Sequence, residues 1–202
     1  LLRREQGTNG EPRFGMLETI REFGLEQLDA SGELLAIQRR HALHFLALSE
    51  AVDPKLRGPD RQTWLERLEQ EQGNLRAALS CMQTDANADS RNCYNILRMA
   101  VALKYFWFFG NHVHEARQWY AAGLQLAAAG AGDAEQGTLV VVTRALCGAG
   151  LMAMVESDFQ VAHSCLEESV AVSRAIGDTE GLAIALRERG MLALFDDPSS
   201  AK

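Results

Sequence analysis

The chain has 202 residues, of which 47% are hydrophobic and 23% charged, a balance typical of soluble globular domains. Its net charge of −7 is shared between residues 1–76 and the remainder, and repulsion from phosphate disfavours direct nucleic-acid binding by this segment. We find no uninterrupted apolar run of the ~18 residues that a membrane span needs, and we expect no membrane contact.

A small β-hairpin is predicted at the N-terminal end. Leu1 and Leu2 begin a short apolar run, and Asn9-Gly10 is a strong signal for a tight turn. Residues 13–17 would return as the second strand. A two-stranded hairpin is only marginally stable by itself, so we expect it to need a neighbour.

Four helices are expected next. Apolar side chains recur at helical spacing over residues 17–28 and 33–52. The second of these helices ends at Asp53-Pro54, because the residue before a proline avoids the α conformation. Trp64 leads a third helix, and Asn74 is expected to cap a fourth.

The character of the sequence changes after residues 84–92, a polar, short-sided segment that is the best candidate for an internal boundary. Beyond it the pattern predicts long helices separated by short turns. These helices are expected over residues 94–109, 113–128, 138–155, 159–176 and 179–195. Helices that alternate with short turns favour an array of stacked helical hairpins, because one hairpin cannot bury both of its faces.

Self-similarity supports the array. Gly150 aligns with Gly190 at an offset of 40 residues, and Ala116 aligns with Ala162 at an offset of 46. We expect these small residues to mark places where two helices cross closely. A bulky residue four positions after each alanine would fill the groove between repeats. The bulky residues are Tyr120 and Leu166.

This pattern resembles the tetratricopeptide repeat (TPR). The best match runs from Leu146 through Gly150 and Ala162 to Ser169, with Asp158-Phe159 opening the second helix. The family's tryptophan and closing proline are missing, and the period exceeds the usual ~34 residues. The resemblance therefore implies the looser TPR-like arrays of large bacterial regulators. The expected fold class is all-α, a TPR-like α-α superhelix of stacked hairpins with a small N-terminal β-hairpin.

A second resemblance covers nearly the whole chain. Residues 13–23, 39–46 and 68–79 look like the segment that follows the ATPase in STAND-type signalling ATPases, which include LuxR/MalT-like and AfsR-like transcriptional regulators. In that family a winged-helix module precedes a helical connector and a TPR-like sensor array. The implied domains are 1–30 as the end of a winged-helix module, 31–86 as the helical connector and 87–202 as the TPR-like repeats.

The same resemblance implies a function. The chain would be a non-catalytic, protein- or ligand-binding sensor module of a larger ATP-dependent transcriptional regulator in the bacterial cytoplasm. Its partners would be a protein or a small signal molecule and the upstream ATPase domain of the same polypeptide, and a homo-oligomer is possible. The P-loop is not in this sequence, so ATP binding does not carry over and no cofactor is expected. A regulator fragment that binds DNA through its winged helix is the alternative.

The consecutive aromatic residues 105–109 point all ways round a helix, so one or two rings should face the concave side of the array. The repeat alignment places three arginines and Cys147 on the same side. Arginines among apolar residues would suit an anionic or acidic-aromatic ligand, unless they pair with neighbouring glutamates. The predicted binding residues are Arg98, Tyr105, Phe108, Arg144, Leu151, Arg187 and Met191.

A nucleotide-dependent enzyme is a further alternative, because residues 148–153 fit the pattern GxGxxA and follow the β-branched run 139–143. A dinucleotide loop needs a strand that ends directly before the first glycine. Four residues intervene here, so glycines at a helix crossing are favoured. We therefore assign no catalytic residue and expect no enzyme.

Metal and thiol chemistry are weakly indicated. The pairs His112/His114 and His41/His44 lack a third ligand at a recognisable spacing, so no metal site is expected. The four cysteines form no CxxC pair, which indicates free thiols in a reducing cytoplasm. The sequence opens without Met and lacks the apolar core of a signal peptide, so we expect a piece of a longer protein.

Overall fold

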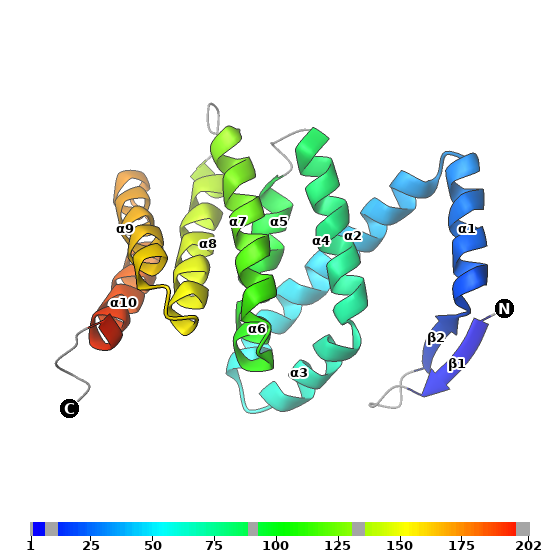
Figure 1. Ribbon diagram of the computed structural model, residues 1–202, viewed down its shortest axis with the longest axis horizontal. Coiled ribbons are helices and arrows are strands. Elements are labelled where there is room, and N and C mark those ends of the chain that lie inside the picture. Colours follow the sequence, from blue (N-terminus) through cyan, green and yellow to red (C-terminus); the bar gives the residue numbers. More distant parts are fainter. Residues whose placement is uncertain (1, 7–11, 89–92, 131–135, 197–202) are drawn as a thin grey trace.

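The computed structural model describes residues 2–6, 12–88, 93–130 and 136–196. These residues form helices, apart from one antiparallel hairpin at the N-terminal end (Figure 1). The elements are β1 (Leu2–Gln6), β2 (Pro12–Met16), α1 (Glu18–Ala30), α2 (Leu34–Val52), the 3-10 helix η1 (Asp53–Arg57), α3 (Arg61–Gln70), α4 (Gln72–Ala88), α5 (Cys93–Ala102), α6 (Lys104–Gly110), α7 (Val113–Ala129), α8 (Gln136–Val155), α9 (Phe159–Ile176) and α10 (Thr179–Asp196). The predicted all-α fold with a small N-terminal hairpin is confirmed.

The hairpin and α1 lie at one end of the molecule (Figure 1). Leu2 pairs with Met16 and Gln6 with Pro12 in an antiparallel register. The tight turn predicted at Asn9-Gly10 lies outside the described residues. Helix α1 packs against α2, yet none of its residues is buried. Helix α1 therefore adds little to the hydrophobic core.

From α5 onward the helices form a two-layered array. Helices α5, α8 and α10 lie in one row, since α8 contacts both of the others. In the second row, α7 packs against α5 and α8, and α9 packs against α8 and α10. On the other side of α5, helices α2 and α4 pack against it and against each other (Figure 1). One continuous core runs through all of these elements.

Two glycines let the neighbours of α8 rest directly on its backbone. A Cβ atom at Gly148 would lie 2.3 Å from Tyr120 Oη on α7, and one at Gly150 would lie 2.9 Å from Leu166 Cγ on α9. The prediction of glycines at a helix crossing is therefore confirmed for α8. It is wrong for Gly190, which has nothing within 4 Å of the position of its missing Cβ.

The bulky residue predicted to fill the groove between repeats does so at Tyr120. Its side chain is fully buried, and its hydroxyl donates a hydrogen bond of 2.8 Å to the carbonyl of Ala100. Trp107 meets the Tyr120 ring edge-on, with 5.8 Å between the ring centroids. The aligned Ala116 and Ala162 are both fully buried, as the repeat alignment predicts for close crossings. Leu166 is fully buried as well.

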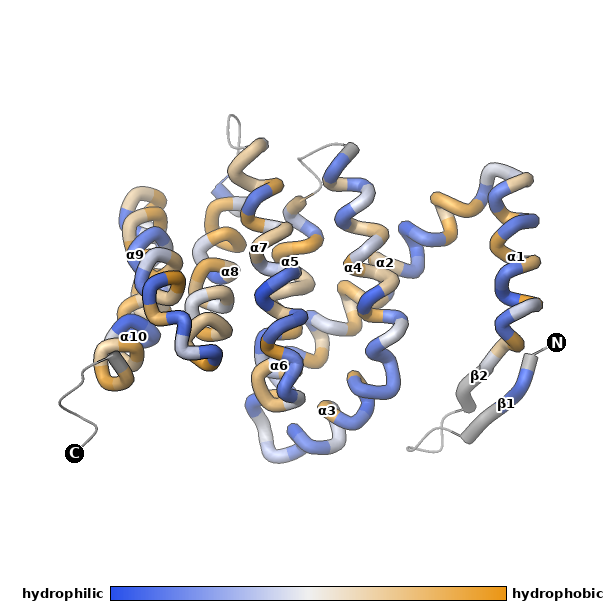
Figure 2. The backbone as a smooth tube through the Cα atoms, in the orientation of Figure 1, coloured by the Kyte–Doolittle hydropathy of each residue, from blue (hydrophilic) through white to orange (hydrophobic). Residues whose placement is uncertain are grey.

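Helix α8 is the most apolar of the long helices (Figure 2). Among the described residues it is the one helix whose length and composition would allow it to cross a membrane. The sequence reading missed this because Arg144 interrupts the apolar run. In the structure α8 packs against α5, α7, α9 and α10, which is the environment of a core helix.

Three local expectations differ from the structure. The helix expected over residues 94–109 is divided into α5 and α6 at Leu103, a break that periodicity does not reveal in a segment apolar nearly all round. Asn74 does not cap α4, which begins two residues earlier; its side-chain amide donates to the Glu71 carboxylate at 2.6 Å. The predicted boundary segment is helical up to Ala88, and residues 89–92 lie outside the described part.

Candidate functional site

A surface cleft of about 380 Å³ lies between η1, the start of α6 and the first half of α10. The packing of the helices explains its position. Helices α5 and α10 both pack against α8, and the cleft lies where residues of η1, α6 and α10 come together. The lining residues are Arg57, Lys104, Tyr105, Glu180, Ala183, Ile184 and Arg187.

The Tyr105 ring is the centre of the cleft's aromatic and cationic contacts. The Lys104 ammonium lies 4.6 Å from the ring centroid, and the Arg57 guanidinium lies 5.6 Å from it. On the neighbouring turn of α6, Phe109 stacks on Tyr105 with 6.1 Å between centroids and meets Phe108 edge-on at 5.1 Å. Cations near the face of an aromatic ring are attracted by its quadrupole, so this side of α6 concentrates positive charge beside exposed rings.

The arginines around the cleft are paired with acidic side chains. Arg57 bonds Asp53 one turn earlier, with 2.7 Å between Nη2 and Oδ2. Arg144 of α8 reaches Glu180 of α10, with 3.0 Å between Nη2 and Oε2. These pairs are partly exposed, so each contributes little to stability, but they fix where the charges lie.

Arg187 and Glu188 form a further ion pair at the inner edge of the cleft. Glu188 is 3% exposed, and its second oxygen, Oε2, has no hydrogen-bond partner among the described residues. The Glu188 carboxylate, and after it the Tyr105 phenol, raise the pKa of Arg187, so Arg187 stays charged at any physiological pH. The pair thus places a permanent cation next to Tyr105.

Lys104 differs from these arginines. No carboxylate of the described chain lies within ion-pair distance of its ammonium, whose one aromatic contact is with the Tyr105 ring. Three cations and one carboxylate line the cleft; with the paired Asp53, Glu188 and Arg144 included, the charged group has a net charge of +1, which Lys104 supplies, in a chain of net charge −7. The cleft is therefore a locally basic site on an acidic protein.

The buried Cys147 lies just beneath this charged group and is not reactive. It is 3% exposed, and its sulfur lies 3.2 Å from the Ser169 hydroxyl. Burial raises the pKa of the Cys147 thiol; the hydrogen bond with Ser169 lowers it, Glu188 raises it, and Lys104 and Arg144 lower it by smaller amounts. At neutral pH the thiol is protonated, and a buried, protonated thiol is a poor nucleophile.

Tyr105 and Arg187 are the two sequence-predicted residues that line the cleft. Arg144 joins them indirectly through its ion pair with Glu180. Phe108, 38% exposed, lies on the aromatic side of α6 next to the cleft, and Met191, 36% exposed, lies one turn beyond Arg187. The structure thus brings Tyr105 and Arg187 together in one cleft.

The remaining two predicted residues lie elsewhere. Arg98 bonds Glu50 of α2 through two contacts of 2.8 Å, and its guanidinium lies over the Tyr94 ring. Leu151 is only 7% exposed and belongs to the core, so its side chain does not line the cleft. All three predicted arginines pair with glutamates, which was the alternative that the sequence left open.

Sequence reasoning missed Arg57, Lys104 and Glu180. Lys104 gave a usable signal, because it is the lone lysine in a helical segment that is otherwise almost entirely apolar. Arg57 and Glu180 gave none, since each reaches the cleft only after η1 and α10 are brought together by tertiary packing. Polar residues at helix ends are common and point to no particular site.

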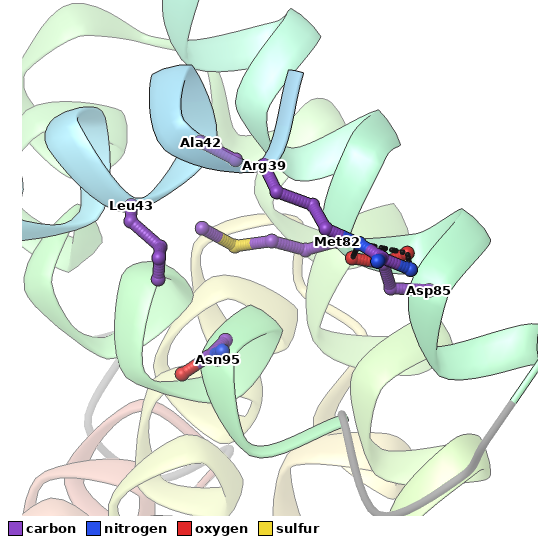
Figure 3. Close-up of a pocket in the computed structure, with 6 residues that line it drawn as sticks. All are labelled: Arg39, Ala42, Leu43, Met82, Asp85 and Asn95. Carbon is purple, nitrogen blue, oxygen red and sulfur yellow. Dashed lines mark hydrogen bonds and ion pairs between the residues drawn. The ribbon is translucent and has the colours of Figure 1, made fainter. Parts of the chain in front are cut away.

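A second groove, of about 330 Å³, lies between α2, α4 and the start of α5. Figure 3 shows Arg39 of α2 beside Asp85 of α4, with Met82 and Leu43 against the same space. Arg39 holds Asp85 through Nε to Oδ2 at 2.9 Å and Nη2 to Oδ1 at 2.8 Å. Because its two charged residues neutralise each other, this groove has no net charge to attract an ion.

Among the described residues, neither a dinucleotide loop nor a metal site is assembled. Residues 148–153 lie inside α8, so the strand that a dinucleotide loop requires is not there. His112 contacts Glu69 at 2.9 Å, whereas His114 is mostly exposed. Within the described ranges, no three His, Cys, Asp or Glu side chains are grouped so as to hold a metal ion.

Comparisons with known proteins connect the chain to bacterial regulators. It is 26% identical over 200 residues to proteins named "Putative HTH-type transcriptional regulator" in Mycobacterium bovis (Mb0914c) and in two strains of Mycobacterium tuberculosis (MT0914 and Rv0890c). The match covers 95% of this chain and 21% of each relative. No family model matches the sequence, and no solved structure matches it. The chain thus spans about a fifth of the length of these relatives, and the similarity supports a regulatory role.

Proposed function

We propose that this chain is a non-catalytic sensor module of a larger, ATP-dependent transcriptional regulator of the bacterial cytoplasm. The observation that carries the proposal is similarity along 95% of the chain to proteins named as HTH-type transcriptional regulators and not as enzymes. An all-helical array with a charged cleft between η1, α6 and α10 suits recognition of a protein or small molecule. STAND-type regulators with a TPR-like sensor are the class in which this order of elements is expected.

The proposed module has three parts. Residues 1–30 would close a winged-helix module, 31–86 would be a helical connector and 87–202 would be the TPR-like sensor. The first boundary fits the packing, because α1 has no buried residue. At the second boundary α2 and α4 share a core with α5, so the connector and the sensor would pack as one unit. The cleft joins the connector to the sensor, since η1 belongs to the first and α10 to the second. A ligand in the cleft would therefore contact both the connector and the sensor.

The test is made in the full-length regulator that contains this sequence. A promoter reporter is measured with the intact protein and with a version lacking residues 93–196, and immunoblotting confirms equal protein levels. We expect the shortened protein to give an output that no longer responds to growth conditions, together with a changed rate of ATP hydrolysis. Normal regulation by the shortened protein would refute the sensor role.

The alternative of DNA binding through the N-terminal end is tested on the chain itself. Duplex DNA is titrated at low ionic strength, where phosphate contacts are strongest. We expect no salt-dependent shift in electrophoretic mobility, because the chain has a net charge of −7. A shift that disappears as salt is added would favour the winged-helix alternative instead.

A further inference from the structure

We propose that the cleft between η1, α6 and α10 binds a small organic anion with a flat aromatic body. The carboxylate of such a ligand would lie between Lys104 and Arg187, and its ring would pack against Tyr105 and Ile184. This inference rests on the sensor function proposed above and names the chemical class of its signal.

The charge argument begins with Lys104. Its ammonium lines the cleft with no carboxylate partner in the described chain, so binding an anion there would break no existing ion pair. Arg187 adds a second cation whose own partner, Glu188, is buried outside the lining. The one carboxylate in the lining belongs to Glu180, and Arg144 already compensates its charge from α8. An entering anion thus meets net attraction.

The apolar argument selects a ring over a simple ion. Tyr105 is partly exposed on the α6 side of the cleft, while Ala183 and Ile184 line it from α10. Inorganic phosphate or acetate would use the cations and leave these apolar surfaces in water. A flat aromatic carboxylate would cover them as well, and stacking on tyrosine adds to the burial of apolar area.

Size favours a small molecule over a peptide. The cleft measures about 380 Å³. Ligand sites for small molecules typically measure about 300–1,000 Å³, so this one is near the lower limit and suits one or two fused rings. Arg57 and Arg187 come from segments far apart in sequence, so such a ligand would also hold the connector against α10.

The experiment uses 2-naphthoate as the probe. The chain is labelled with ¹³C at isoleucine methyl groups, and the Ile184 resonance is followed by NMR during titration. We expect a saturable shift of that resonance with a Kd on the order of 1 mM, given about 0.3 kcal/mol for each of some 13 heavy atoms. Two further compounds divide the contributions: neutral 2-naphthamide keeps the rings, and acetate keeps the charge. We expect both to bind at least about fivefold more weakly, because each lacks one of the two attractions.

Matched variants identify the residues. Lys104→Met keeps an apolar side chain of similar length and removes the charge, and Arg187→Gln removes the second cation. We expect each to weaken 2-naphthoate about five- to tenfold, the range of a charge-assisted contact that is partly exposed. Arg189→Gln is the control, because Arg189 is exposed on the same helix and its substitution removes an equal charge at a position away from the cleft. It should leave the Kd unchanged, and circular dichroism shows whether each variant is folded.

Several results would overturn the proposal. One is that 2-naphthoate causes no shift of the Ile184 resonance. Another is that 2-naphthamide, acetate or inorganic phosphate binds as tightly as 2-naphthoate. A third is that Arg189→Gln changes the Kd of 2-naphthoate as much as Lys104→Met does. If Lys104→Met fails to fold, the dependence of wild-type binding on ionic strength decides, since an ionic contact weakens between about 0.1 M and 0.5 M salt. If 2-naphthoate does not bind but the reporter still depends on residues 93–196, the proposed ligand class is wrong and the sensor function stands.

Discussion

Trp107 in the array and Phe23 in α1 are both aromatic residues of helices, but Trp107 is 2% exposed and Phe23 is 59% exposed. The same contrast holds for whole elements. Half of the residues of α8 are buried, whereas none in α1 is. Both regions are helical, so helix formation does not separate them. The array is held by packing between helices, while α1 depends on local hydrogen bonds and its contact with α2.

The largest expected effect tests that contrast with two aromatic truncations. Trp107→Ala removes a buried ring that meets Tyr120 edge-on, and it should lower the free energy of unfolding by about 3–5 kcal/mol. Phe23→Ala removes an exposed ring and should change it by no more than about 0.5 kcal/mol. Urea denaturation followed by circular dichroism measures both. Comparable losses would mean that α1 belongs to the same cooperative core as the array.

Glycine-to-alanine substitutions should have opposite signs in the two regions. At Gly148 the new methyl group would meet the rigid, buried Tyr120 ring, with 2.3 Å to Oη and 2.5 Å to Cζ. We expect a net loss of about 1–3 kcal/mol despite the better helix propensity of alanine. At Gly24 in α1 nothing lies within 4 Å, so alanine should stabilise α1 by about 0.5–1 kcal/mol. Thermal unfolding gives the sign, and a stabilising Gly148→Ala would contradict the close crossing.

A smaller effect is expected from one buried hydroxyl. Tyr120→Phe removes the hydrogen bond to the Ala100 carbonyl and keeps the ring, so we expect a loss of about 1 kcal/mol. Tyr94→Phe is the control, because the Tyr94 ring is only partly buried and contacts Arg98 through its face. Urea midpoints of the two variants should differ. Equal midpoints would show that the hydroxyl of Tyr120 is satisfied equally well by water in the unfolded chain.

The smallest effect is a difference in acid sensitivity. The hydrogen bond from Arg76 of α4 lowers the pKa of Glu115 of α7 below its ordinary value of 4.5. A lowered pKa in the folded state adds stability above the unfolded pKa, and this is lost as pH falls through the folded one. Glu115→Gln should therefore reduce the loss of thermal stability below about pH 4.5.

Glu18 of α1 is the matched case for the acid series. Its pKa is also lowered, mainly by the hydrogen bond from Arg21, but both side chains are exposed within one helix. Glu18→Gln should leave the acid unfolding of the array unchanged, because α1 has no buried residue. The melting temperature across a pH series measures both variants. If the two substitutions changed the acid sensitivity equally, the ion pair between α4 and α7 would matter no more than the one within α1.

Much of the array could be predicted because its signals are local. Apolar periodicity and turn residues predicted α9 with its observed bounds and placed α7 and α10 within one residue of theirs. The capping residue Asp158, whose carboxylate accepts from the Val161 amide, marks the start of α9 in the sequence as well as in the structure. Where the whole surface of a helix is apolar, as around Leu103, this local information runs out.

The candidate site could be predicted only in part. Tyr105 and Arg187 can be predicted because repeat alignment puts equivalent positions on one side of the array. The same reasoning fails for Leu151, because its side chain is 7% exposed and belongs to the core. Which carboxylate each arginine would choose depends on distances between helices, and no spacing in the sequence contains them.

The two glycines of α8 have a mechanical consequence. They are two residues apart, which places them about 200° apart around the helix axis. Tyr120 therefore packs against the α8 backbone from one side and Leu166 packs against it from the other. Rotating or sliding α8 would force at least one of these side chains against a bulkier neighbour of its glycine. We therefore expect movement that widens or narrows the cleft to come from tilting of α10, α6 or η1, while α8 keeps its position.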